Sequence, residues 1–220
     1  MSRPIAFFAL LFCISSPAQP PQARHNSFRW DYHKAQEPDG DHTLAKASGL
    51  SAADNAAAHL RIMQLMRPFF VEERDALKRN PAEIVNDTRL RLIDLNGDGI
   101  PEVIASPSGA DGECGAANCV LWVLQKSPSG YRTILDTSNG RGTGGVQSFT
   151  LMESKTSGFR DLILAAHDSA RDSTLYIYRF GKGRYLAREC YEASWPWDMP
   201  DNADVPPTIT PCKRAGAVGY

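Results

Sequence analysis

The sequence predicts a mainly β fold with N-terminal helices, that is, an α+β protein whose strands form two four-stranded antiparallel units. Short apolar segments separated by Gly, Ser, Asn and Asp residues occupy positions 87–190, and this spacing is typical of antiparallel strands joined by turns. Apolar residues at helical spacing are confined to positions 49–86. The strand pattern also occurs twice, at about 88–136 and 146–190.

The first 18 residues have the pattern of a secretory signal peptide. Arg3 precedes an apolar run from Ile5 to Ile14, and Ser16 and Ala18 fit the positions before a cleavage site. The run is too short to span a bilayer. We therefore expect cleavage after Ala18, a periplasmic or secreted protein, and no transmembrane segment in the mature chain.

The segment that follows is expected to be a flexible leader over residues 19–48, because Pro, Gln, His, Asp and Gly occur there without a period. The alternation of Phe28, Trp30 and Tyr32 leaves a short strand or docking arm as the alternative. The helical segment should begin with Ser51 as N-cap and Asp54 three residues later. Pro68 is expected to end this helix and to open a second one, which Asn80-Pro81 would stop. The Pro-rich residues 191–220 are expected to form a C-terminal tail.

The two β units align with an offset of 59 residues at Gly99 and Gly158, and of 54 at Leu121 and Leu175. The first copy therefore carries five extra residues between these points. Each copy has the same order of four strands, so each unit is expected to resemble a propeller blade. The expected strands are Leu90–Leu92, Val103–Ile104, Val120–Leu124, Tyr131–Leu135, Phe149–Met152, Leu162–Ala165, Leu175–Phe180 and Tyr185–Arg188.

Composition excludes several classes of partner. The chain has 220 residues, 24 Lys plus Arg, 25 Asp plus Glu and a formal net charge of −1, which removes the electrostatic case for nucleic acid or an acidic membrane. A hydrophobic content of 42% with 22% charged residues is that of an ordinary globular protein and not of a disordered chain.

The acidic loop between the first two expected strands carries the most chemical information. A hard cation such as Ca²⁺ prefers six to eight oxygen ligands, which alternate residues of a tight loop supply from one side. Gly99 stands where a sharp turn requires a residue without Cβ. The expected ligands are the side chains of Asp94, Asn96, Asp98 and Glu102 and the carbonyl of Ile100.

This loop, Asp-x-Asn-Gly-Asp-Gly-x-x-Glu before a short apolar strand, resembles the calcium loop of FG-GAP (integrin-type, or VCBS) repeats. With the Cys-x4-Cys segment after it, the region 88–190 also resembles small exported bacterial proteins of unknown activity. The resemblance implies one structural Ca²⁺, because Glu153–Thr156 replace the ligands in the second copy. The alternative is a turn without metal, since Asn-Gly and Asp-Gly are also strong hairpin signals.

Cysteine usage agrees with export. Cys13 lies in the signal peptide, so four of the five cysteines remain in the mature chain, and three pairings are possible. The expected disulfides are Cys114–Cys119, a local clip, and Cys190–Cys212, which would pin the tail.

Other polar clusters are weaker signals. His167-Asp168-Ser169 is better explained as a polar turn than as a catalytic triad, because triads are assembled from distant positions. The glycine-rich 139–145 lacks the Lys-Ser/Thr of a phosphate loop and is expected to connect the two units. Trp195 and Trp197 could form a recognition patch or pack on a sheet.

We therefore expect an exported, non-enzymatic, calcium-stabilised protein that binds a protein or another envelope component. One alternative is a secreted hydrolase that uses the carboxylates of Asp111 and Glu113. Another is an inhibitor of a secreted enzyme that uses the insertion between the two units as a probe.

Overall fold

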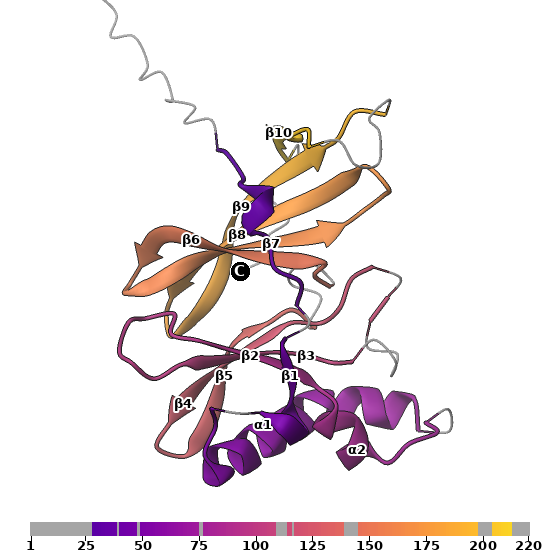
Figure 1. Cartoon of the computed structure of the whole chain (residues 1–220), viewed down its shortest axis with the longest axis vertical. Helices are drawn as coiled ribbons and strands as arrows, with labels where there is room; N and C mark the ends of the chain where they lie inside the picture. Colours follow the sequence, from indigo (N-terminus) through magenta and orange to yellow (C-terminus); the bar gives the residue numbers. More distant parts are fainter. Residues whose placement is uncertain are drawn as a thin grey trace, which may run out of the picture.

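A computed structural model describes residues 28–38, 40–47, 49–74, 77–108, 114–115, 117–138, 145–197 and 204–212. The expected signal peptide, residues 1–18, lies outside these ranges. The described chain forms two antiparallel sheets of five strands each, which lie one above the other with the helices below the first sheet (Figure 1). The expectation of a mainly β, antiparallel protein with N-terminal helices is confirmed.

The first sheet has its strands in chain order, β1-β2-β3-β4-β5, so each strand pairs with its neighbour in sequence. Its edge strand β1 comes from the segment expected to be a flexible leader, and it pairs through His42 with Leu90. The strands are β1 (His42–Thr43), β2 (Arg89–Ile93), β3 (Glu102–Ser106), β4 (Trp122–Ser127) and β5 (Gly130–Asp136).

The second sheet has the order β10-β9-β8-β7-β6, again following the chain. Lys182 and Gly183 have φ values of 53° and 77°, which form the tight turn between β8 and β9. The strands are β6 (Ser148–Thr156), β7 (Phe159–His167), β8 (Asp172–Gly181), β9 (Arg184–Ser194) and β10 (Thr208–Pro211). The predicted number of four strands per unit was wrong by one, because β1 and β10 extend the two meanders at their edges.

The helices are α1 (Ala52–Glu72) and α2 (Pro81–Asn86). Ser51 caps α1 as expected, since its Oγ accepts a hydrogen bond from the Asp54 amide at 3.1 Å. Pro68 does not end α1, and the prediction was wrong because Phe69 and Phe70 beyond it pack against the core under the first sheet. Among the described residues, no helix is long and apolar enough to cross a membrane.

Asn80-Pro81 begins a helix and does not stop one, contrary to the prediction. The Asn80 side chain accepts a hydrogen bond from the Ala82 amide at 2.9 Å, and Pro81 occupies the first turn, where its missing N–H costs nothing.

The described part of the leader, residues 28–38 and 40–47, is packed on the sheets rather than free. It contains two short 3₁₀ helices, η1 (Tyr32–Lys34) and η2 (Leu44–Lys46). Leu44 is fully buried under the first sheet, and Trp30 packs on the second. Residues 19–27 lie outside the described ranges.

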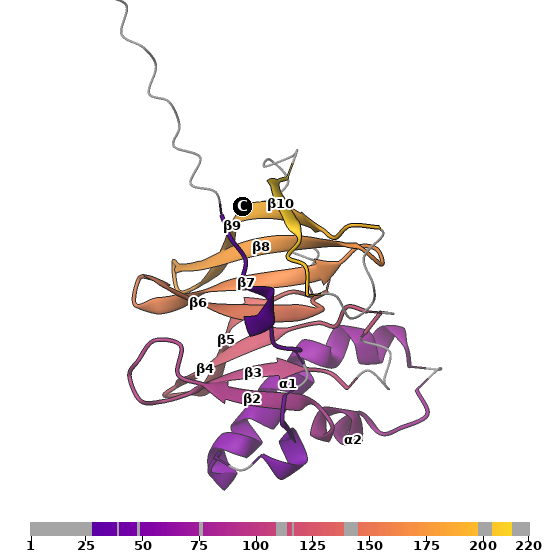
Figure 2. The same ribbon diagram turned by 45° about the horizontal axis from the view of Figure 1, so that its top comes forward.

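The described residues form three apolar layers, and Figure 2 shows the order of the elements that bound them. The helix layer joins α1 and α2 to the first sheet through residues such as Ile62, Met66 and Trp122. The central layer lies between the sheets and includes Ile104, Leu121, Phe149, Leu162 and Tyr178. The outer layer covers the far face of the second sheet and includes Ile163, Leu175, Ile177, Phe28 and Trp30.

Candidate metal centre

The acidic loop lies between β2 and β3, at an end of the first sheet. Gly97 and Gly99 both have φ +83°, a conformation that residues with a Cβ rarely adopt, so the two glycines let the chain fold back tightly. Asp94 and Asp98 are exposed, whereas Glu102 is buried at the start of β3. The expected ligand residues are therefore within one compact turn.

The side chains of this turn accept hydrogen bonds from its own backbone. The Asp94 carboxylate accepts from the amides of Gly97 at 2.7 Å and Gly99 at 2.9 Å. The hydrogen bond from Gly99, followed by that from Gly97, holds the pKa of Asp94 below its usual range, so the carboxylate is ionised at neutral pH. Asn96 accepts from the Asp98 amide at 2.8 Å, and Asp98 accepts from the Ile100 amide at 2.7 Å.

Glu102 anchors the loop through its buried carboxylate. It is 2% exposed, and its carboxylate accepts hydrogen bonds from the Leu95 amide at 2.9 Å and the Gln125 side chain at 3.1 Å. Asn96 donates a longer bond to the same carboxylate, at 3.5 Å. Burial raises the pKa of Glu102, although the hydrogen bonds from Leu95 and Gln125 oppose the shift.

Leu95 connects the acidic loop to the second sheet. Its side chain is fully buried in the layer between the sheets. Its carbonyl accepts a hydrogen bond from the Arg160 amide of β7 at 2.8 Å. From the same β6–β7 hairpin, the Lys155 ammonium lies 3.4 Å from the point that a Cβ on Gly97 would occupy. The loop is thus held by both sheets.

The structure tests the arrangement of these residues but not the ion. Among the described residues, no group of three or more His, Cys, Asp or Glu side chains is arranged to hold a metal ion. The donor set nevertheless fits Ca²⁺ chemically, because all five groups are oxygens and two are exposed carboxylates. The calcium site therefore stays a prediction.

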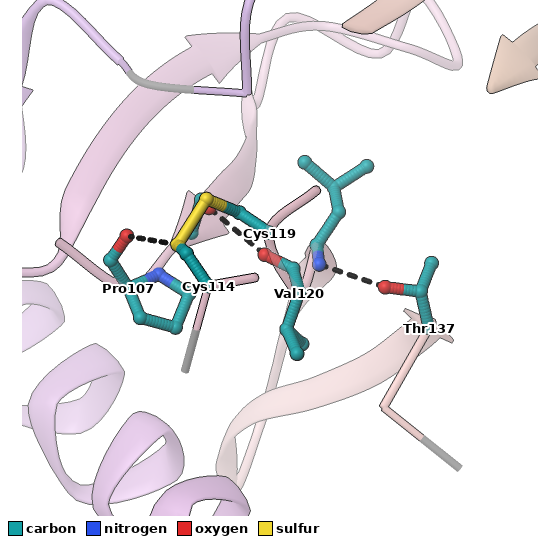
Figure 3. The surroundings of a disulfide bond; sticks show 7 residues. Pro107, Cys114, Cys119, Val120 and Thr137 are labelled. Carbon is teal, nitrogen blue, oxygen red and sulfur yellow. Dashed lines mark hydrogen bonds between the residues drawn. A yellow bond between two sulfur atoms is a disulfide. The ribbon is translucent and has the colours of Figure 1, made fainter. Parts of the chain in front are cut away.

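The insertion that follows β3 is closed by the disulfide Cys114–Cys119, as expected (Figure 3). Cys119 exchanges two backbone hydrogen bonds with Val146, at 3.0 and 2.7 Å, next to the start of the second sheet. Asn118 also donates to the His167 carbonyl at 2.9 Å and accepts from its amide at 2.8 Å. Asn118, which lies inside the clip, therefore ties the insertion of the first unit to β7 of the second sheet.

The second disulfide is Cys190–Cys212, which joins β9 to the end of β10 and confirms the expected pairing. Residues 208–211 of the expected tail form the edge strand β10, whereas residues 191–194 of that tail belong to β9. Near it, Trp195 packs in the outer layer, whereas Trp197 is 80% exposed with the Arg171 guanidinium 5.9 Å from its ring. The two tryptophans thus have different environments.

Of the other polar candidates, some lie within the described residues and some outside them. His167, Asp168 and Ser169 lie where β7 turns into β8, and Asp168 accepts a hydrogen bond from Thr174 at 2.6 Å. Ser169 instead donates to Asp172 at 2.7 Å. Asp111 and Glu113, proposed for a hydrolase, and residues 139–144 of the glycine-rich connection lie outside the described residues.

Three residues of the site were not found from the sequence: Leu95, Gln125 and Lys155. An apolar residue between two ligand positions is a signal that could have revealed Leu95 as an anchor. Gln125 and Lys155 carry no such signal, because they reach the loop only through strand pairing and sheet packing. Comparison of the chain with protein-family models, curated proteins and solved structures gave no match.

Proposed function

We propose that this chain is an exported, non-enzymatic binding protein in which one Ca²⁺ stabilises the acidic loop 94–102. The proposal rests mainly on one observation: alternate residues of an exposed turn carry oxygen donors, and the turn is anchored in the layer between the sheets through Leu95. Calcium sites in extracellular modules use this kind of donor set and bind at about 10⁻⁴ to 10⁻³ M.

Charge also supports the calcium proposal. Asp94, Asp98 and Glu102 place three carboxylates within nine residues, and Asp94 is held ionised by backbone amides. From the second sheet, the Lys155 ammonium lies beside Gly97. The ion would be held by Asp94, Asn96, Asp98, the Ile100 carbonyl and Glu102, and it would neutralise repulsion that one lysine only partly offsets.

The family resemblance is supported by the way the two β units repeat. Glu102 accepts a hydrogen bond from the Leu95 amide at 2.9 Å, and Asp161 accepts one from the Ser154 hydroxyl at 2.8 Å. Both acids are buried, and each member of the second pair lies 59 residues after its counterpart. This equivalence favours an FG-GAP-like duplication of a propeller-blade-like unit, with an ion site retained only in the first copy.

Export is supported by the sequence pattern of residues 1–18 and by the two disulfides, since such bonds persist in oxidising compartments. Binding is supported by Trp197, the most exposed of the large apolar side chains described, which lies beside Arg171. Trp and Arg are the residue types that contribute most at protein interfaces.

Thermal unfolding with calcium and with chelator tests the ion. At 10 mM Ca²⁺ a site of the expected affinity should stabilise the fold by about 1.4–2.7 kcal/mol, which raises Tm by roughly 3–10 °C. Asp98→Asn should abolish most of this shift. Glu153→Gln, at the equivalent of Asp94 in the second sheet, is the matched control and should retain it. No shift in the unsubstituted protein, or an equal shift in Asp98→Asn, would sink the proposal.

A further inference from the structure

The two sheets stack in the same orientation, so that their corresponding faces point in the same direction along the stack. In the first sheet Ile104, Leu121 and Val123 point into the layer between the sheets. Their counterparts in the second sheet, 59 or 54 residues later, are Ile163, Leu175 and Ile177, and these lie in the outer layer. The pattern is the same on the other face: the helix-facing Leu90, Val103 and Trp122 correspond to Phe149, Leu162 and Tyr176 between the sheets.

Because of this order, the outer face of the second sheet corresponds to a face that is buried between the sheets in the first unit. In the first sheet, the equivalent face is buried by the sheet that follows it in the chain. The second sheet has no following sheet among the described residues, yet its outer face is equally apolar: Ile163, Ala165, Leu175, Ile177 and Ala193 are all nearly inaccessible to solvent. The face is thus built for stacking and is covered by something other than a sheet.

Part of the cover is the N-terminal arm, residues 28–36 (Figure 2), and Trp195 and Ile209 from the C-terminal part of the chain pack on the same face. Phe28 stacks on Tyr191 with ring centroids 4.3 Å apart, and Trp30 meets Trp195 edge to face at 6.1 Å. The Trp30 indole N–H donates to the Thr150 hydroxyl at 3.1 Å. Gln36 then exchanges two backbone hydrogen bonds with Phe149, at 2.7 and 2.8 Å.

We infer that residues 28–36 are a displaceable end cap, and that removing the cap lets the outer face pair with the same face of a second copy of this chain. The arm side chains that cover the face, Phe28 and Trp30, are only partly buried. The helix cap at the opposite end is more firmly held, because Ala58, Ile62 and Met66 of α1 are fully buried. The arm is therefore the cap that opens first.

The partner can be inferred from the opposite end of the stack, where the helices cover the first sheet. A head-to-tail contact would require the helix-facing side of a first sheet, which α1 and α2 occupy in every copy. Among the described residues, the outer face alone becomes available when the arm leaves, so the contact it makes is isologous, and association stops at a dimer. The dimer buries apolar surface that a monomer without its cap would leave in water.

Sedimentation velocity of the full chain in chelator tests this inference independently of the calcium proposal. The double variant Phe28→Ser/Trp30→Ser is expected to dimerise with rising concentration, with a dimer fraction at least about tenfold above that of the unsubstituted protein. Trp197→Ser is the matched control: it removes an exposed aromatic residue outside the arm and should leave the protein monomeric. A peptide of residues 28–38 should return the double variant to monomer by reoccupying the face.

Thr150→Val provides a milder variant that keeps the arm sequence and the size of the side chain, while it removes the acceptor for the Trp30 indole. It should dimerise to an intermediate extent, and it decides the question if the double variant does not fold. The inference is overturned if Thr150→Val, and the double variant where it folds, remain monomeric over the same range. Dimers that the peptide does not dissociate would also contradict it.

Discussion

Replacing Leu95 with alanine measures how strongly the acidic loop is anchored between the sheets. The Leu95 side chain is fully buried among residues of both sheets, and its amide and carbonyl bond to Glu102 and Arg160. The substitution leaves the backbone bonds available but opens a cavity. Fully buried Leu→Ala changes cost about 2.7–5 kcal/mol, and contact with two sheets places Leu95 in the upper half, near 4 kcal/mol.

The assay is urea unfolding in chelator, followed by tryptophan fluorescence, because Trp122 is buried in the first sheet and reports its exposure. Ile100→Ala is the control, since this residue of the same loop is 51% exposed and should cost less than about 1 kcal/mol. Equal midpoints for the two variants, with unchanged slopes, would show that Leu95 does not anchor the loop. Repeating the melts with calcium should show a smaller calcium shift in Leu95→Ala.

Two further predictions concern Tyr178, in β8, and Trp197, which follows β9. Burial raises the pKa of Tyr178 to about 12, so its neutral form stabilises the fold fully below pH 10 and this stability is lost as pH rises through 12. Tyr178→Phe should therefore reduce the loss of stability between pH 9 and 12 by about 2 kcal/mol in urea titrations, and an unchanged pH profile would contradict the burial argument. Trp197→Ala should weaken capture of partners from native envelope extract, whereas Val71→Ala, also exposed, should not. Equal capture by both variants would show that Trp197 does not contribute to partner binding.

Most of the fold could be predicted because its signals are local. Gly181 and Lys182 with Gly183 specify a hairpin within a few residues, and Ser51 caps α1 with Asp54 three positions away. The edge strands β1 and β10 were missed, since two to four residues of ordinary composition become strands only by pairing with β2 and β9. Pro68 stays inside α1 because tertiary packing of the following aromatic residues outweighs a local rule.

The ligand residues of the candidate site could be predicted from the sequence, but the residues from other strands that hold the loop could not. The ligand residues are contiguous, so the spacing of Asp94, Asn96 and Asp98 is visible in the sequence. Their hydrogen-bond partners within the turn follow from the same spacing. Gln125 and Lys155 reach the loop from β4 and from the second sheet, and no periodicity in the chain encodes those distances.

The arrangement of strands in chain order has a consequence for the time course of folding. Each sheet is built from consecutive strands, so most of its pairings close short loops and can form early. The contact between Trp30 and Thr150 joins residues 120 positions apart and requires the second sheet to exist before it can form. Docking of the arm is therefore a late event, and until it occurs each newly folded chain exposes an apolar face to its neighbours.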